Sequence, residues 1–164
     1  TNGGNITFTN AAAALRVGGL TKLEAGVTFA ASGQSTLANY LESTWTPAVS
    51  TDGTAPQYTS SVGRYTRIGN RVFVDIYLSG DGGNEGSGGT YFRLDLPITA
   101  GASHPAQYFP AGYYINNAGK MNCNGSISGG GTYIQLQDGT FSDMNAADQS
   151  GTDREIRLKF FYEV

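Results

Sequence analysis

Hydrophobic and polar residues alternate along most of the chain after residue 48, and this period of two predicts strands. The clearest stretch is GRYTRIGNRVFVDIYL, residues 63–78, in which two alternating runs flank Gly69-Asn70. A two-residue turn that starts with glycine is typical of a tight β-hairpin, so two antiparallel strands are expected here. The second run has apolar side chains on both faces, with Phe73 and Tyr77 opposite Val74. We therefore expect it in the middle of a sheet.

Further segments continue the alternation towards the end of the chain. TYFRLDLP (90–97) and TYIQLQDG (132–139) alternate clearly, and QYFPAGYYI (107–115) and KMNCNGSIS (120–128) have the composition of strands. The final segment, REIRLKFFYEV (154–164), keeps the period of two to its last residue, so the C-terminus is expected inside a sheet. About seven to nine strands separated by turn signals predict an all-β fold, a jelly-roll-like β-sandwich.

The first forty residues have a different composition and predict a separate part of the molecule. They are rich in Gly and Ala, and their strand-like pieces, NITF and GVTF, are too short to form a sheet alone. We therefore expect residues 1–40 to form a shaft that gains its core from neighbouring copies of the chain. A β-sandwich tip domain over residues 41–164 would follow it. Within the shaft, AAAALRV (11–17) could instead form a short helix, because Ala is the best helix former.

The junction between the two parts is predicted at residues 40–47. STLANYLES (35–43) has the apolar spacing of a short helix or turn, and Pro47 would end any helix there. The only tryptophan, Trp45, lies in this junction. A buried indole supplies a large contact area, so Trp45, together with Tyr40 and Pro47, is predicted to anchor the shaft to the knob. The alternative is that Trp45 faces solvent as a stacking platform for a sugar ring.

Composition and charge narrow the classes of partner. Ten basic and thirteen acidic residues give a net charge of −3, which builds no phosphate-binding field and excludes nucleic acid as an expected partner. No apolar stretch approaches the roughly 18 residues of a membrane-spanning helix, so membrane insertion is not expected. The single cysteine, Cys123, excludes a disulfide within the chain, and its surroundings predict a buried, unreactive thiol.

The sequence holds no recognisable catalytic motif. HExxH, GxSxG, the P-loop and CxxC do not occur, and the one histidine, His104, precedes a proline in a loop. Carboxylates that could hydrolyse a glycoside are present, but no spacing pairs them. The Gly-rich run 79–89 lacks the ligand spacing of a calcium loop, so a hairpin loop is expected there. We expect a protein that is not an enzyme and that uses no metal and no cofactor.

Several of these segments together resemble a known family. They are GVTFAASGQS (26–35), YLESTWTPAVS (40–50), QYTSSVGRYTRIGNRVFVDIYL (57–78), LPITA (96–100) and the run from Leu136 to Val164. This pattern is similar to the C-terminal receptor-binding region of bacteriophage tail fibres and tailspikes, from about Gly26 to the end of the chain. Such tips have a G-[IV]-x-F segment, a junction close to EGTWTP and a hairpin close to GxYTxIGxxV. Ser43 stands where the pattern has Gly, which affects the turn geometry expected there.

The resemblance implies a homotrimeric fibre tip on the virion, with a short intertwined β shaft and a β-sandwich knob. It also implies attachment to a host receptor, commonly a polysaccharide on the bacterial surface, and contact with other tail proteins through the N-terminus. Two alternatives remain open at this point. One is a short tailspike enzyme that depolymerises a glycan, and the other is a structural decoration domain of the virion.

Candidate receptor contacts are expected where exposed aromatic rings occur beside amides and carboxylates, because sugar hydroxyls need such partners. Two stretches have this composition, residues 104–117 and 135–149, and loops on a rigid scaffold often carry recognition. The candidates are Tyr108, Tyr113, Tyr114, Asn116, Asn117, Gln137, Asp143 and Asn145.

Overall fold

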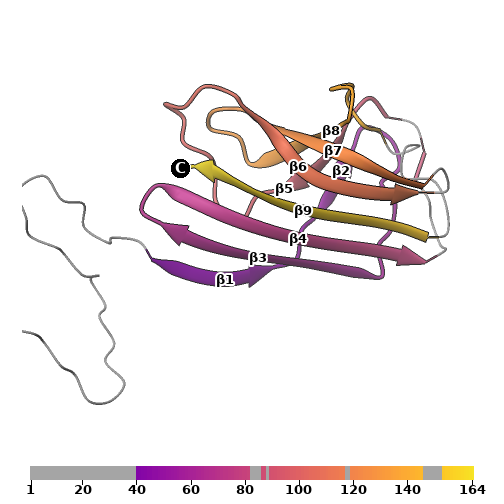
Figure 1. The fold of residues 1–164 in the computed structure, drawn as a ribbon, viewed down its shortest axis with the longest axis horizontal. Helices are drawn as coiled ribbons and strands as arrows, with labels where there is room; N and C mark the ends of the chain where they lie inside the picture. The colour runs from indigo at the N-terminus through magenta and orange to yellow at the C-terminus, as the bar shows by residue number, and fades with distance from the viewer. Residues whose placement is uncertain (1–39, 82–85, 88, 117–118, 146–152) are drawn as a thin grey trace, which may run out of the picture.

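A computed structural model describes residues 40–81, 86–87, 89–116, 119–145 and 153–164 (Figure 1). The expected shaft over 1–39, including its possible helix at 11–17, and the candidate Asn117 lie outside the described residues. The boundary between shaft and knob therefore stays a prediction.

The described part is all-β, as predicted, and its strands are antiparallel throughout. Its order across the sheet is β1-β3-β4-β9-β6-β7-β8-β5-β2 (Figure 1). The strands are β1 (Leu41–Trp45), β2 (Val49–Thr51), β3 (Ser60–Ile68), β4 (Arg71–Asp81), β5 (Phe92–Asp95), β6 (Gln107–Asn116), β7 (Gly119–Ile127), β8 (Tyr133–Asp138) and β9 (Asp153–Glu163).

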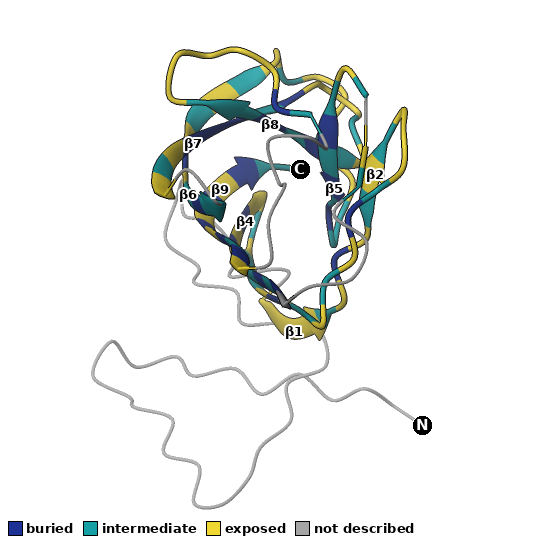
Figure 2. Cartoon of the chain, turned by 90° about the vertical axis from the view of Figure 1, so that its right-hand side faces the viewer, coloured by how far each residue is buried: buried dark blue, intermediate teal, exposed yellow. Residues whose placement is uncertain are grey.

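The sheet curls into a half-barrel around its own core (Figure 2). Its two edge strands, β1 and β2, are consecutive in the chain and are joined by residues 46–48 alone. This connection is held from both sides: the Ser61 hydroxyl donates to the Pro47 carbonyl (2.8 Å), and Asp95 accepts a hydrogen bond from the Ala48 amide (2.5 Å). The short link between the edges therefore requires the sheet to bend round.

The β-sandwich expected from the sequence would consist of two separate sheets, whereas these strands form one hydrogen-bonded sheet. The continuity depends on the pairing of β6 with β9, two segments far apart in the chain. Alternation determines which side chains face inward, but it does not determine which strands become neighbours. This is why the strand content could be predicted and the sheet arrangement could not.

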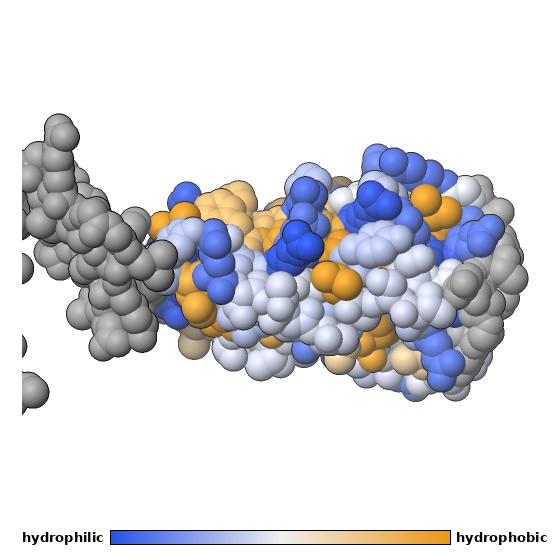
Figure 3. Space-filling view, turned by 90° about the horizontal axis from the view of Figure 1, so that it is seen from below, coloured by the Kyte–Doolittle hydropathy of each residue, from blue (hydrophilic) through white to orange (hydrophobic). Residues whose placement is uncertain are grey.

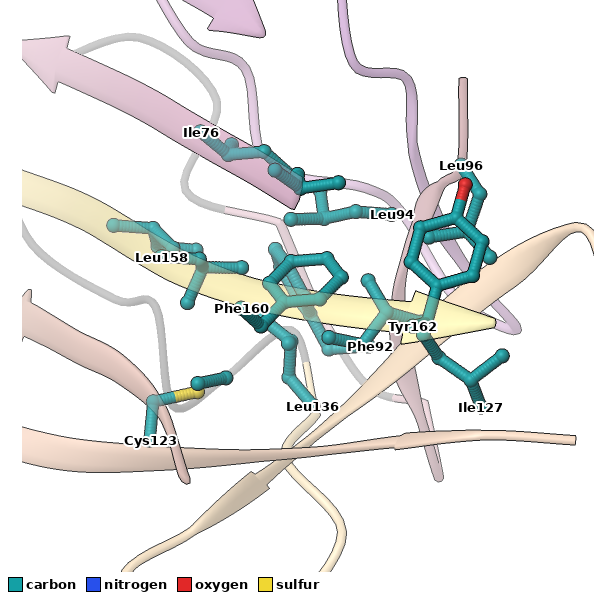
Figure 4. Packing of buried hydrophobic residues seen from close by; sticks show 14 of the residues in the cluster. Ile76, Phe92, Leu94, Leu96, Cys123, Ile127, Leu136, Leu158, Phe160 and Tyr162 are labelled. Carbon is teal, nitrogen blue, oxygen red and sulfur yellow. The ribbon is translucent and has the colours of Figure 1, made fainter. Parts of the chain in front are cut away.

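The apolar faces that alternation predicts for β4, β5, β8 and β9 line the core, which confirms the alternation there (Figure 4). In β4 and β9 the inward residues are almost completely buried, and Phe92, Leu94, Ile134 and Leu136 meet them from β5 and β8. The C-terminus is also tied into the sheet as predicted, because the Val164 amide donates to the Asn70 carbonyl (2.8 Å). The Gly69-Asn70 turn joins β3 to β4 with a positive φ of 61° at Gly69, as a glycine-first hairpin turn requires.

Two local features differ from the sequence pattern. The prediction of a helix or turn over 35–43 is wrong at Leu41–Ser43, which belong to β1, because pairing with Thr66 and its neighbours in β3 outweighs a weak local helix spacing. The second feature is a bulge in β6 between Pro110 and Gly112. At Gly112 (φ 155°) an added Cβ would lie 2.0 Å from the carbonyl oxygen of Arg157. Only glycine lets β6 approach β9 this closely.

Candidate ligand-binding groove

A groove of about 780 Å³ lies on the outer face of β6, β7 and β9. The sheet register brings its side chains together, because Tyr113 of β6 lies directly across from Arg157 of β9 on one side and from Asn122 of β7 on the other. We call it the amide–aromatic groove, lined by Tyr113, Asn122, Asn124, Phe141, Arg157 and Lys159 over the backbone of the β6 bulge.

A polar network fixes the side chains at one end of this groove. The Tyr113 hydroxyl donates to Glu155 (3.1 Å), and the Arg157 guanidinium donates to the same carboxylate through Nε (2.8 Å). The Lys120 ammonium lies 3.7 Å from the centroid of the Tyr113 ring. Loss of water around the hydroxyl, followed by its bond to Glu155, raises the pKa of Tyr113. The phenol therefore stays protonated and remains a hydrogen-bond donor at neutral pH.

The turn at residues 138–142 forms one wall of the groove and presents Phe141 to solvent. The Asp138 carboxylate accepts hydrogen bonds from the Thr140 amide (2.8 Å), the Thr140 hydroxyl (2.7 Å) and the Ser142 amide (3.0 Å). The Thr140 hydroxyl makes the largest contribution to lowering the pKa of Asp138, with help from the two amides. Within this turn Phe141 has a φ of 65° and is 61% exposed. A bulky residue in the left-handed region is strained, and such strain persists only where surrounding bonds enforce it.

The segment that follows the turn is anchored in the core. Met144 is completely buried, and its amide donates to the Leu136 carbonyl (3.0 Å). The Gln137 side-chain Nε2 donates to the Asp143 carboxylate (2.9 Å), which ties the returning chain to β8. The Cys123 thiol contacts the Met144 sulfur and is buried, as predicted, and burial raises the pKa of Cys123 to about 12. The exposed Phe141 is therefore carried by a rigid support.

The described receptor candidates from the sequence divide into four groups. Tyr113 lines the groove, and Tyr108 is exposed on the same face of β6. Gln137 and Asp143 hold the loop that follows the turn, whereas Asn116 and Asn145 are half-buried at the ends of described segments. Tyr114 is only 3% exposed and its hydroxyl contacts the Met121 sulfur, so this candidate belongs to the core and not to the receptor-facing surface.

Five groove residues were missed by sequence reasoning: Asn122, Asn124, Phe141, Arg157 and Lys159. Four of them lie in strands whose outward positions looked like ordinary polar surface. Phe141 lies inside the candidate stretch 135–149, and the run Asp-Gly-Thr around it marks a turn. That turn signal next to an aromatic residue was the one available hint.

Trp45 packs against the body of the sheet. Its indole covers Gly63, where an added Cβ would lie 2.5 Å from the ring, and it meets Tyr65 edge-on at 5.9 Å. Its Nε1 is buried without a hydrogen-bond partner among the described residues. Pro47 is buried beside it, and Tyr40 is exposed and donates to Glu42. Trp45 is thus half-buried against the sheet, and its role towards the shaft stays a prediction.

A second groove, of about 750 Å³, lies on the outer face of β1, β3, β4 and β9. Register aligns Thr66, Phe73 and Phe161 across three strands, and the two phenylalanine rings lie 5.9 Å apart. We call this the apolar groove, lined by Glu42, Thr44, Arg64, Thr66, Phe73, Asp75, Lys159 and Phe161. Figure 3, which views the molecule from the side of β1 and β3, shows hydrophobic residues at the end where the described chain begins.

Neither a metal cluster nor a membrane helix occurs in the part of the chain that the structure describes. No three or more His, Cys, Asp or Glu side chains there are placed to hold a metal ion. The described residues also form no helix that is long and apolar enough to cross a bilayer. His104 pairs with Glu163 (3.1 Å), which ties the loop before β6 to the last strand.

Comparisons with known proteins find no family model that matches this chain, and no curated protein or solved structure that matches it. Its function therefore has to be inferred from its own residues and their geometry.

Proposed function

We propose that this chain is the tip of a homotrimeric bacteriophage tail fibre that attaches the virion to a host surface polysaccharide without cleaving it. Residues 1–40 are the intertwined shaft and residues 41–164 the knob. The two halves of the curled sheet face each other across one core, an arrangement compatible with a jelly-roll-like knob (Figure 2). The polysaccharide binds in the amide–aromatic groove.

The observation that carries this proposal is the exposed, strained Phe141 beside two amides and two cations. An aromatic face offers a stacking surface for a pyranose ring, and the exposed side-chain amide of Asn122 offers a donor and an acceptor for hydroxyl groups. Asn124 is buried, and its side-chain nitrogen donates to the Asp138 carbonyl (2.8 Å), so it supports the Phe141 turn from below. The turn holds its bonds before any ligand arrives, so little conformational freedom is lost on binding. A rigid aromatic residue held outward against its backbone preference is costly for a fold and useful for recognition.

The assembly part of the proposal is supported by the apolar residues on the other half of the outer face. Val62, Ile68, Phe73 and Phe161 are all more than a third exposed on β3, β4 and β9. Phe73 and Phe161 lie side by side at the centre of the apolar groove, and exposed apolar surface of this kind marks contact sites on soluble proteins. The face begins at β1, which continues directly from the segment proposed to form the shaft. A trimer would present three polysaccharide grooves, so weak single-site binding becomes strong through multivalency.

Binding of the full chain to host cells and to their purified surface polysaccharide tests the proposal. The expected result is saturable binding to cells that the free polysaccharide competes away, at a mass of three chains by light scattering. Incubation with the same polysaccharide should release no oligosaccharide. Released fragments would establish the depolymerase alternative, and binding to virion proteins without binding to any cell would establish the decoration alternative. A monomer that binds the polysaccharide would remove the assembly claim and leave the receptor claim standing.

A further inference from the structure

The outer face of β5 and β8 carries an arginine held between two aromatic rings. The Arg93 guanidinium carbon lies 3.9 Å from the centroid of the Tyr91 ring and 4.2 Å from that of Tyr133. The strand register explains the arrangement. Arg93 of β5 lies directly across from Gln135 of β8, and Tyr133 lies two residues before Gln135 in β8. The Arg93 Nε donates to the Gln135 side-chain oxygen (3.1 Å), which fixes the guanidinium within its plane.

The guanidinium of Arg93 differs in its partners from three other cations on the outer face, each of which has a carboxylate partner. Arg157 is bonded to Glu155, Lys159 to Asp75, and Arg71 to Glu163. For Arg93, Gln135 is the only hydrogen-bond partner within the described residues, and no carboxylate there lies within ion-pair distance. Stacking on both faces and a bond at Nε leave the terminal nitrogens as the available donors. A pre-oriented guanidinium without a counter-ion recognises a planar anion through two parallel hydrogen bonds.

The stack lies on the same outer face as the amide–aromatic groove. Asn124 pairs with Gln137 across β7 and β8, and Ser126 pairs with Gln135, which in turn pairs with Arg93. Arg93 is thus two strands away from Asn124 and two residues further along, roughly 12 Å by the usual strand spacings. An oligosaccharide spans this distance and a single sugar does not.

We propose that the Tyr91–Arg93–Tyr133 stack binds the carboxylate of an acidic sugar in the polysaccharide that occupies the groove. This inference rests on the proposed function and adds the substrate class, a glycan containing a uronic or similar carboxylated sugar. The sugar ring lies against a tyrosine face while its carboxylate accepts from the terminal nitrogens of Arg93. The two tyrosines and Gln135 position the guanidinium.

The test is an array of bacterial-type oligosaccharides in which each carboxylated glycan is printed beside its carboxyl-reduced form and a sulfated form. The full chain is expected to bind carboxylated glycans about tenfold more tightly than their reduced partners. Arg93→Gln is expected to abolish this preference and to retain the residual binding of the reduced glycans. Arg93→Lys keeps the charge but not the planar fork, and is expected to recover only part of the preference. Arg67→Gln removes a cation from the β3–β4 hairpin and serves as the matched control, with the preference unchanged.

The possible outcomes distinguish the acidic-sugar assignment from the proposal of polysaccharide attachment on which it rests. Equal binding of carboxylated and reduced forms overturns the acidic-sugar assignment and leaves polysaccharide attachment in place. Equal binding of carboxylated and sulfated forms shows charge attraction without recognition of a carboxylate, and also overturns it. Binding to no glycan overturns both proposals. Circular dichroism of each variant confirms that a lost preference does not come from a lost fold.

Discussion

The two grooves on the outer face of the sheet share Lys159 and differ in almost every other respect. The apolar groove is built on long regular strands whose outward residues include two exposed phenylalanines. The amide–aromatic groove is built on a bulge and a strained turn, and its exposed Phe141 is held by hydrogen bonds to the Asp138 carboxylate. Regular strands give a broad surface suited to contact with another protein, and irregular backbone gives a shaped hollow suited to a small ligand.

The comparison teaches that an exposed aromatic residue has to be interpreted from its support. Phe73 follows the strand alternation and has an extended backbone, so its exposure costs the fold nothing beyond unburied surface. Phe141 is exposed at a backbone conformation that its side chain disfavours. Strain of this kind argues for selection at that position, whereas exposure alone does not.

The largest effect is expected from Gly112→Ala, which should disrupt the amide–aromatic groove at its base. The added Cβ would overlap the Arg157 carbonyl oxygen at 2.0 Å, and backbone cannot move aside as a side chain can. The expected loss is about 3 kcal/mol in the free energy of unfolding, measured by urea titration. Gly119→Ala is the matched control, because it also has a positive φ but no atom within 4 Å of the new Cβ, and about 1 kcal/mol is expected. Equal losses for the two variants would show that close approach of β6 to β9 is not critical.

The next effect concerns assembly. Replacing both Phe73 and Phe161 by Ser removes the centre of the apolar groove and should weaken association by about 3 kcal/mol, roughly a hundredfold or more. Sedimentation at decreasing concentrations should show the double variant dissociating where the unmodified chain remains assembled. Phe141→Ser, the same substitution at a single phenylalanine that is more exposed than either, should leave the mass unaltered. Dissociation by Phe141→Ser alone would mean that the groove assignments are reversed.

Features set by neighbouring residues could be predicted from the sequence, and features set by contacts between distant segments could not. The hairpin, the inward faces of β4 and β9 and the tied C-terminus follow from alternation, because each is set by residues adjacent in the chain. The pairing of β6 with β9, the bulge at Gly112 and the stack around Arg93 depend on contacts between distant segments, which no local period encodes. Tyr114 illustrates the limit: it and its neighbour Tyr113 are identical in type, and only the register decides that Tyr113 faces outward and Tyr114 faces the core.

Ligand binding is expected to change less than assembly but in a more diagnostic way. Phe141→Gly should lower affinity for the polysaccharide about tenfold, since the stacking face is lost. The same variant should raise the free energy of unfolding by about 1 kcal/mol, because glycine adopts a φ of 65° without strain. Titration calorimetry and urea unfolding measure the two quantities on one sample. A variant that loses stability together with affinity would mean that Phe141 serves the fold.

The smallest effect is a dependence of binding on pH through the turn that presents Phe141. The pKa of Asp138 is lowered in the folded state, chiefly by the Thr140 hydroxyl. Its stabilisation of the turn is therefore complete above the ordinary Asp pKa of about 3.9 and is lost as pH falls through the lower folded value. Affinity for the polysaccharide should therefore be constant from about pH 5 to 8 and decline only below about pH 4.

Asp138→Asn retains an acceptor oxygen but cannot titrate. This variant should bind the polysaccharide slightly more weakly at neutral pH and lose the acid decline that comes from this turn. The amide shifts of Thr140 and Ser142 followed by NMR report the same titration directly. An unchanged acid decline in the Asn variant would show that the effect does not come from Asp138, and would separate the presentation of Phe141 from the charge of Asp138.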